Sequence, residues 1–574
     1  MVRPSGLPSR LQIRYPLSLR ERVGEVPAVE GLMQDYELSL QHVLWRIERL
    51  HQKKEVVTKR DHGMHRITNG EMVPRINRLA GALKRLGVKP GDRVATLAWN
   101  NYRHLELYYA VPCMGAVLHT LNLRLFSQHL EFIVNDAEDK VIFVDQNLVP
   151  LLKPLAGKIP TVTTIVLMTD GAPAGDHELG EMLDYETLLA AESDDYPWPK
   201  LSERMAAAMC YTSGTTGNPK GTVYSHRSQF LHTMGVLQAD NLGITEHDVV
   251  LPVVPMFHAN SWGLPYACGM SGSKLLLPDR FSADAKSLVE MAEQEGATFL
   301  AGVPTVWLNL ANYLKETGKR LPKVHTVVCG GSAIPRSLME SMDAVGLRML
   351  HAWGMTETSP LGSVGRPRSG TIAEDELEVR LTQGAVVPAV EIRISDPATG
   401  AELPWDGVAF GEIQVRGPWI ARGYHNGYDA GKLTEDGWFR TGDVAKITPE
   451  GYIKIVDRTK DVIKSGGEWI SSVELENAIM AHPKIMEAAV IGLAHSKWDE
   501  RPVAFAVPKP EFKGKVTQEE VIEFLKDKVA KWWLPDEVRF IDEVPKTSVG
   551  KFDKKVLRVG AVPIKESASS GVRL

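Results

Sequence analysis

The alternation of apolar and polar residues predicts helices and strands that take turns along the first half of the chain. Between Arg75 and Leu86 the apolar residues fall on one helical face, and Gly87 follows as a natural helix end. A turn then leads into a strand-like run at 93–99, and further strand-like runs follow at 141–144, 164–167, 274–277, 298–300 and 324–328. This repeated alternation predicts an α/β fold of layered, mostly parallel sheets covered by helices.

The pattern changes in the second half of the chain. Segments 390–395 and 411–416 alternate apolar and polar residues, which predicts a small module of half-buried β-strands. From residue 457 onward, two strand-like runs precede a helix that opens at Thr517 with the capping-box partner Glu520. The expected organisation is an unstructured extension at 1–32, a large N-terminal domain at 33–456, a small α+β domain at 457–564 and a tail at 565–574.

Composition and charge restrict the classes of function. The 574 residues include 66 lysines and arginines interspersed with 71 aspartates and glutamates, so no basic field favours nucleic acid. The four cysteines are isolated in sequence, which favours reduced thiols in a cytoplasmic protein over disulfides or a zinc site. No segment reaches the ~18 consecutive apolar residues of a membrane-spanning helix, so any membrane contact would be peripheral. A small-molecule substrate is the resulting prediction.

A loop rich in glycine and hydroxyl groups follows the strand-like run 205–211. Its glycines let the backbone approach an anion, its hydroxyls add donors, and Lys220 adds a compact positive charge. The Walker A pattern cannot be threaded through this loop, which argues against P-loop nucleotidases and kinases, and a plain Ser/Thr/Gly linker is the alternative interpretation. The residues expected to bind phosphate are Thr212, Ser213, Gly214, Thr215, Thr216, Gly217 and Lys220.

The segment 211–221 closely resembles the phosphate-loop signature of the adenylate-forming superfamily, which includes acyl-CoA synthetases, peptide-synthetase adenylation domains and luciferases. Three further segments resemble signatures of that superfamily in the same order, at 351–357, 439–443 and 545–555. The resemblance covers most of the chain and is strongest to bacterial medium- or long-chain fatty acyl-CoA synthetases. It implies the layered α/β fold predicted above, with a small C-terminal domain that is mobile.

The resemblance implies a nucleotide site built from these segments. Trp353 would offer a flat face to adenine, although Trp353 taken alone would be interpreted as a core aromatic residue. Asp443 would accept the ribose hydroxyls, with Arg458 beside it. Glu357 would hold Mg²⁺, a cation that prefers carboxylate, phosphate and water oxygens. The other residues implied for the nucleotide and its metal are Gly330, Gly331, Ser332, Gly354, Thr356 at the α-phosphate, and Thr215 at Mg²⁺.

The same resemblance implies how the acid and CoA are handled. Lys551 resembles the catalytic lysine that orients the carboxylate in the first step, and His258 borders the acid pocket. Trp262 resembles a residue that gates a hydrophobic acyl tunnel, with a packed core tryptophan as the alternative. Lys460 lies where relatives hinge between their two domains, so that one domain presents two faces in turn. The residues implied for the second step are Lys464, beside the adenylate, and Gly466 and Gly467, along the pantetheine channel.

Together these inferences predict an ATP-dependent ligase that joins a carboxylic acid, in the first instance a fatty acid, to CoA through an acyl-adenylate. Mg²⁺ is the predicted cofactor, ATP and CoA are co-substrates, and a homodimer is the expectation from bacterial relatives. Three alternatives stay open. In the first, the acceptor is a carrier protein instead of CoA. In the second, the acid is aromatic or otherwise small. In the third, the chain is a catalytically silent sensor of a nucleotide or acyl ligand.

Overall fold

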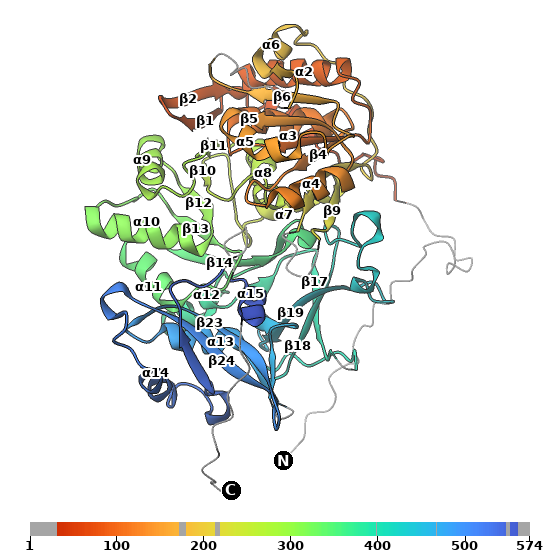
Figure 1. Ribbon diagram of the computed structural model, residues 1–574. Helices are drawn as coiled ribbons and strands as arrows, with labels where there is room; N and C mark the ends of the chain where they lie inside the picture. The colour runs from red at the N-terminus through yellow and green to blue at the C-terminus, as the bar shows by residue number, and fades with distance from the viewer. Residues whose placement is uncertain are drawn as a thin grey trace, which may run out of the picture.

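The computed structural model arranges the strands of the described chain in three sheets (Figure 1). The described residues are 31–171, 179–212, 218–397, 399–465, 468–546 and 552–560. The strands of the two larger sheets end at Arg458, and the third sheet begins at Ile463. This arrangement confirms the α/β fold that the sequence predicts.

The smaller of the two N-terminal sheets has seven strands. In spatial order they are β7 (Met182–Asp184), β6 (Thr164–Met168), β5 (Asp139–Asp145), β3 (Arg93–Leu97), β4 (Val117–Thr120), β8 (Ala206–Tyr211) and β9 (Gly221–Ser225). Neighbouring strands are parallel from β7 to β8, whereas β9 runs antiparallel to β8. The predicted phosphate loop connects β8 to β9, so it leaves the carboxyl end of a parallel strand.

The larger sheet has thirteen strands and changes character along its width. In spatial order they are β17 (Glu391–Ser395), β18 (Phe410–Arg416), β19 (Phe439–Ile447), β20 (Tyr452–Arg458), β16 (Gly384–Val386), β15 (Leu361–Val364), β14 (Met349–Gly354), β13 (Thr326–Cys329), β12 (Phe299–Gly302), β10 (Val249–Pro252), β11 (Lys274–Leu277), β1 (Glu55–Arg60) and β2 (Gly63–Thr68). From β14 to β1 the pairs are parallel, and β15 begins an antiparallel region. The β module expected after residue 385 is therefore a continuation of this sheet.

The C-terminal sheet has five strands. They follow the order β22 (Glu468–Ile470), β21 (Ile463–Ser465), β24 (Asp499–Pro508) and β23 (Ile485–His495), and β25 (Glu537–Phe540) pairs with β24. The described α-helices are α1 (Gln41–Arg49), α2 (Asn69–Arg85), α3 (Tyr102–Cys113), α4 (Ser127–Asp136), α5 (Val149–Leu152), α6 (Tyr185–Ala190), α7 (His226–Leu237), α8 (Leu264–Ser271), α9 (Ala285–Glu295), α10 (Pro304–Thr317), α11 (Arg336–Ala344), α12 (Ala373–Leu381), α13 (Ser472–Met480), α14 (Gln518–Leu525) and α15 (Lys554–Gly560).

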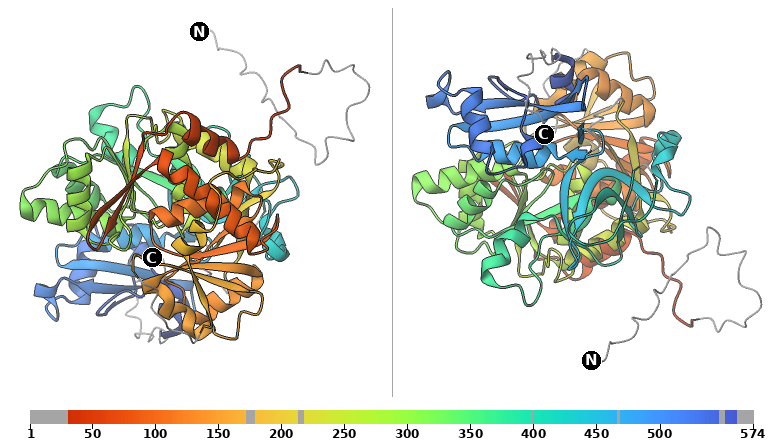
Figure 2. Two further views of the ribbon diagram at one scale, coloured as in Figure 1. Left: turned by 90° about the horizontal axis from the view of Figure 1, so that it is seen from above. Right: turned by 90° about the horizontal axis from the view of Figure 1, so that it is seen from below.

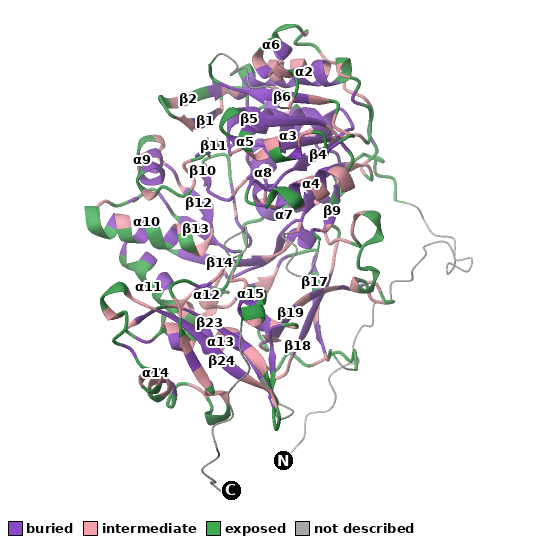
Figure 3. Ribbon diagram, in the orientation of Figure 1, coloured by how far each residue is buried: buried purple, intermediate pink, exposed green. Residues whose placement is uncertain are grey.

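Helices cover both faces of the two larger sheets, as parallel strands require. One large core joins the facing sides of both sheets to α2, α3 and α8 between them. The outer face of the seven-stranded sheet packs against α4 and α5, and the outer face of the parallel strands in the larger sheet packs against α9, α10 and α11. Figure 3 shows the strands of these layers largely buried, whereas α10 carries both buried and exposed residues.

The C-terminal sheet has hydrophobic cores of its own. Its alternate residues pack on α13 and α14 on one face and on α15 on the other. Figure 2 shows this part of the chain, in blue, set against one side of the larger body. The domain division at 456–457 stays a prediction.

Most of the elements that the sequence predicts lie within a few residues of their expected bounds. The helix expected from Arg75 is α2, which starts earlier because Thr68 and Glu71 form a reciprocal capping box, and Gly87 follows its end with φ +83°. Of the capping box expected at the start of α14, the bond from the Glu520 N–H to the Thr517 hydroxyl is present at 3.3 Å.

The structure bears on two expectations from the sequence, about the cysteines and about membrane-spanning helices. Cys113, Cys210, Cys268 and Cys329 are buried and free of disulfides, and burial raises the pKa of Cys210 to about 11, which keeps this thiol protonated. Among the described helices, none combines the length and the apolar character needed to cross a membrane.

A buried ion pair joins α2 to α3 inside the large core. Arg75 Nε lies 2.5 Å from Glu106 Oε1, and the Glu106 side chain is fully buried. The Tyr185 hydroxyl donates to the other carboxylate oxygen at 2.5 Å, and Glu186 binds the far side of the Arg75 guanidinium at 2.8 Å. Every charge in this cluster therefore has a partner, which a buried carboxylate requires.

We expect Glu106→Ala to lower the free energy of unfolding by about 3 kcal/mol, because it leaves Arg75 and Tyr185 without their buried partner. The shift of the urea midpoint measures this loss. The control is Glu48→Ala, which removes an exposed carboxylate 3.8 Å from Arg49, and should change stability by about 0.5 kcal/mol or less. Equal shifts in the two variants would contradict the expectation.

Candidate functional site

Two residues from different strands bind the buried carboxylate of Asp443. Trp353 at the end of β14 donates its indole N–H to Asp443 Oδ2 at 2.9 Å. Arg458 Nε lies 2.6 Å from the other oxygen, Oδ1, because the register of β19 and β20 places Asp443 opposite Arg458. An ionised carboxylate has about four acceptor sites, so two remain for further donors such as a vicinal diol.

The strand that carries Trp353 ends in a tight bulge. A β-carbon on Gly354 would lie 1.7 Å from the Pro360 carbonyl oxygen, so no other residue fits this position. The register of β14 and β15 shifts between Trp353 and Gly354, and the chain then enters a short 3₁₀ turn at Thr356–Thr358. The bulge thereby sends Thr356 and Glu357 away from the sheet.

Backbone and side-chain bonds hold this turn. The Tyr224 hydroxyl of β9 donates to the Thr356 carbonyl at 2.8 Å, and the Glu357 carbonyl accepts the Ala421 N–H at 2.8 Å. The Tyr424 hydroxyl donates to Glu357 Oε1. Burial and the neighbouring carboxylate raise the pKa of Tyr424, so its phenol stays protonated and keeps donating.

The Glu357 carboxylate fits the part of a magnesium ligand. It is 5% exposed, its Oε1 is bonded to Tyr424, and within the described residues no hydrogen bond or ion pair occupies Oε2. A single carboxylate is sufficient when phosphate oxygens and water complete an octahedral Mg²⁺ shell. The second predicted ligand, Thr215, lies outside the described residues.

Both ends of the predicted phosphate loop are held together. The Thr212 N–H donates to the Lys220 carbonyl at 2.9 Å, and the Lys220 N–H donates to the Thr212 hydroxyl at 3.2 Å. The Lys220 ammonium pairs with Asp429 at 2.6 Å and lies 5.4 Å from the centre of the Tyr424 ring. The intervening predicted residues, Ser213, Gly214, Thr215, Thr216 and Gly217, lie outside the described residues.

The predicted acid-pocket segment contains a left-handed turn. After the half-buried His258, residues Ala259, Asn260, Ser261 and Trp262 have φ angles of 42°, 50°, 51° and 57°. Such angles disfavour L-residues, so neighbouring contacts must hold the turn. The Cys210 thiol donates to the Asn260 side-chain oxygen at 2.9 Å, and the Ser261 hydroxyl donates to the Val254 carbonyl at 2.9 Å.

This turn brings Trp262 against the predicted adenine-binding turn. A β-carbon on Gly330 would lie 3.1 Å from the Trp262 ring and 2.9 Å from the Ala352 carbonyl oxygen. Gly331, with φ +90°, and Ser332 follow as exposed residues. Trp262, Gly330 and the end of β14 are therefore in contact.

The predicted C-terminal residues are only partly described. Burial lowers the pKa of Lys460, whose carbonyl oxygen accepts a bond from Arg558 at 3.3 Å. Lys464 is exposed on β21, and its backbone N–H donates to Glu500 at 2.9 Å. Gly466, Gly467 and Lys551 lie outside the described residues.

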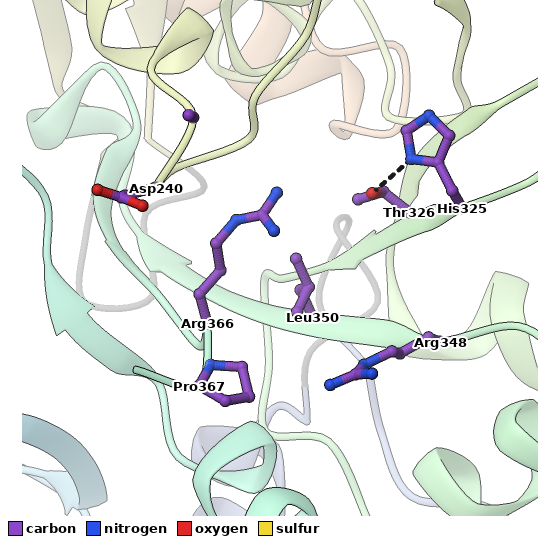
Figure 4. A pocket seen from close by; sticks show the side chains of 8 residues that line it. Asp240, His325, Thr326, Arg348, Leu350, Arg366 and Pro367 are labelled. Atoms are coloured by element: carbon purple, nitrogen blue, oxygen red, sulfur yellow. Dashed lines mark hydrogen bonds between the residues drawn. The ribbon is translucent and has the colours of Figure 1, made fainter. Parts of the chain in front are cut away.

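A cavity of about 310 Å³ lies at the amino ends of β13 and β14 in the larger sheet (Figure 4). Thr326 begins β13 and Arg348 precedes β14, whereas Gly330 and Gly354 stand at the carboxyl ends of these strands. Figure 4 shows the Arg366 side chain extending into this cavity. It is thus separate from the site around Asp443.

Sequence reasoning missed three residues of the site, namely Asn260, Tyr424 and Asp429. Asn260 lies between His258 and Trp262, which the resemblance had singled out. Its side chain reaches Cys210 because of the left-handed backbone at this position. Tyr424 and Asp429 flank Asn426 and Gly427, residues that are typical of an ordinary turn or loop. Nothing in the sequence links that loop to Lys220 or Glu357.

Known protein families and relatives match nearly the whole chain. The model of the family described as AMP-binding enzyme matches residues 44–425, and that of the AMP-binding enzyme C-terminal domain matches residues 474–551. A long-chain-fatty-acid–CoA ligase from Thermus thermophilus is 48% identical over 545 residues, covering 94% of this chain and 98% of that protein. A medium-chain-fatty-acid–CoA ligase from Ectopseudomonas oleovorans is 42% identical over 546 residues, covering 94% and 99%.

A solved structure shares the fold over a similar extent. ATP-bound MatB from Rhodopseudomonas palustris superimposes with a TM-score of 0.78 at 27% sequence identity, covering 91% of this chain and 99% of that chain.

We expect Trp353→Phe to raise the KM for ATP by roughly tenfold, because it removes a hydrogen bond to a charged group. Steady-state kinetics at saturating acid and CoA measure this change. The matched control is Trp438→Phe, since Trp438, which precedes β19, is also buried but packs on Arg393 and Arg416 instead. An unchanged KM for ATP in Trp353→Phe, or an equal rise in the control, would argue against a role for this bond.

Proposed function

This chain belongs to the AMP-binding enzyme family, and on that premise we propose that it is an acid–thiol ligase that joins a fatty acid to CoA through an acyl-adenylate. ATP supplies the adenylate, and AMP and pyrophosphate are released. The observation that carries the proposal is the convergence of Trp353 and Arg458 on the buried Asp443 carboxylate. The superfamily resemblance assigns these three residues to adenine and ribose from three separate segments.

In the first half-reaction, a carboxylate oxygen of the acid attacks the α-phosphorus of ATP, and pyrophosphate leaves. Asp443 would accept the ribose hydroxyls and thereby fix the nucleotide along the end of β14. Thr356 would donate to the α-phosphate, and Lys220 would balance the charge of the departing phosphates. Lys551 would orient the acid's carboxylate. Mg²⁺, held by Glu357 and Thr215, would supply charge compensation between the phosphate oxygens.

In the second half-reaction, the CoA thiolate attacks the carbonyl of the acyl-adenylate, and AMP leaves. The mixed anhydride makes this possible, since a free carboxylate repels the thiolate and has a poor leaving group. We propose that the C-terminal domain, 457–564, turns about Lys460 between the steps. Lys464, Gly466 and Gly467 would then replace Lys551 at the site.

The acid would enter beside the left-handed turn. His258 would border the proposed pocket. Trp262 packs on Gly330, next to the strand that carries Trp353. A ring in this position would separate the adenylation site from an apolar channel for the acyl chain. The names of the relatives support a medium- or long-chain acid.

We also propose that the enzyme works in the cytoplasm as a homodimer, with peripheral contact to membranes as its source of acid. Four buried free thiols support a reducing compartment. The exposed rings of Tyr36 and Trp45, which both contact His42, provide apolar surface of the kind that interfaces use.

Release of pyrophosphate, measured with and without CoA over acids of increasing length, tests the proposed function. We expect release that depends on acid, with acyl-CoA and AMP formed only when CoA is present. Acid-dependent release that CoA does not carry forward would favour transfer to a carrier protein. A preference for short or aromatic acids would favour the alternative in which the acid is aromatic or otherwise small. The absence of acid-dependent pyrophosphate release would contradict every enzymatic interpretation.

We expect Trp262→Ala to change the ratio of kcat/KM between long and short acids by roughly tenfold, because contact with a few methylenes supplies selectivity of this size. Trp405→Ala is the control, since Trp405 is 39% exposed and lies outside the site. If the ratio stayed the same in Trp262→Ala, the gate would be excluded and the interpretation as a packed core residue retained.

A further inference from the structure

Lys220, the lysine proposed to bind phosphate, is already paired with a carboxylate of the same chain. Lys220 Nζ lies 2.6 Å from Asp429 Oδ2, and the two side chains are 29% and 36% exposed. Asp429 belongs to a segment, residues 424–429, that we call the counter-ion loop. The same loop contributes Tyr424, whose ring lies beside the Lys220 ammonium and whose hydroxyl binds Glu357. One loop thus contacts both charged groups assigned to the ATP phosphates and their metal.

The counter-ion loop is fixed to the seven-stranded sheet. Asp136, the last residue of α4, accepts the Tyr428 hydroxyl at 2.7 Å and the Asn426 side-chain amide at 3.0 Å. Asp136 also accepts the Tyr211 hydroxyl at 2.7 Å, and Tyr211 ends the strand that leads into the phosphate loop. The loop is therefore anchored to the same structure that positions the phosphate loop.

Close packing brings the counter-ion loop directly onto the base of the phosphate loop. A β-carbon on Gly221 would lie 3.2 Å from the His425 β-carbon and 3.0 Å from the Tyr211 ring, so only glycine fits comfortably after Lys220. Asp429 itself has a left-handed backbone, with φ +55°. The bond from the Tyr428 hydroxyl to Asp136 precedes this residue, and the Lys432 N–H donates to the Asp429 carbonyl at 3.0 Å. Contacts on both sides therefore hold the conformation that directs Asp429 toward Lys220.

A lysine that is paired with a carboxylate must release it before it binds a phosphate oxygen. The same carboxylate is available again when the phosphate departs. We propose that Asp429 is the internal anion that Lys220 exchanges for phosphate oxygens, so that Asp429 weakens the binding of ATP and speeds the departure of pyrophosphate. This inference rests on the proposed function for the role of Lys220, and it makes Asp429 a positioning residue.

The variant Asp429→Asn removes the competing charge and keeps the shape of the side chain. We expect the Kd for ATP in the absence of acid, measured by calorimetry, to fall about two- to fivefold, the range of a partly exposed ion pair. The inhibition constant of pyrophosphate should fall by a similar factor. A merely structural role for Asp429 would raise both constants or leave them unchanged, because a loosened site binds phosphate no better.

Two further variants make the test specific. Asp436→Asn removes an acidic charge from the same connection, but Asp436 pairs with Arg393 at 2.7 Å, so ATP and pyrophosphate binding should stay as in the wild type. In the Lys220→Met background, Asp429→Asn should have no further effect, because the cation for which Asp429 competes is gone. Weaker or unchanged ATP binding in Asp429→Asn, or the same gain in the Lys220→Met background, would overturn the inference.

The failure of this inference can be told apart from the failure of the proposed function. Calorimetry with ATP alone needs no turnover and reports on Asp429 directly. Acid-dependent pyrophosphate release by the wild-type protein reports on the proposed function. Tighter ATP binding in Asp429→Asn without such release would support the exchange at Lys220 and reject the ligase.

Discussion

A buried carboxylate cannot be left without donors, and the arrangement of the site follows from this constraint. Asp443 is 3% exposed, so its charge has to be matched by groups that the fold brings to it. Trp353 and Arg458 meet this need from two other strands, β14 and β20. Because β14 is also the strand where the parallel sheet turns antiparallel, the carboxylate connects the two regions of the largest sheet.

The sequence pattern predicted some of the elements but not their order in space. Short apolar runs indicated β5, β6 and β11, and alternation indicated β17, because burial on both faces or on one face leaves a local record in the side chains. That β15–β20 extend the parallel sheet depends on hydrogen bonds between residues such as Trp353 and Ser363, whose pairing no local pattern specifies. The site residues assigned from the superfamily resemblance, by contrast, came with a shared geometry, and Trp353, Asp443 and Arg458 do meet.

The residues that sequence reasoning missed share one physical reason. Lys220 and Asp429 are separated by 209 positions, and Cys210 and Asn260 by 50, so each contact is a product of the tertiary fold. The direction of the Asp429 side chain also depends on a left-handed backbone angle, which the presence of an aspartate in a loop does not predict. Lone charged or amide side chains in loops are common on any surface, and only their partners distinguish these.

The left-handed turn at residues 259–262 stores backbone strain where Trp262 meets Gly330. Each non-glycine residue held at such angles costs on the order of 1 kcal/mol, so the turn is the kind of feature that selection for stability alone would remove. The strain lies in the same four residues that set Trp262 against Gly330, so a change that relaxed the backbone here would act on the position of this ring as well as on stability.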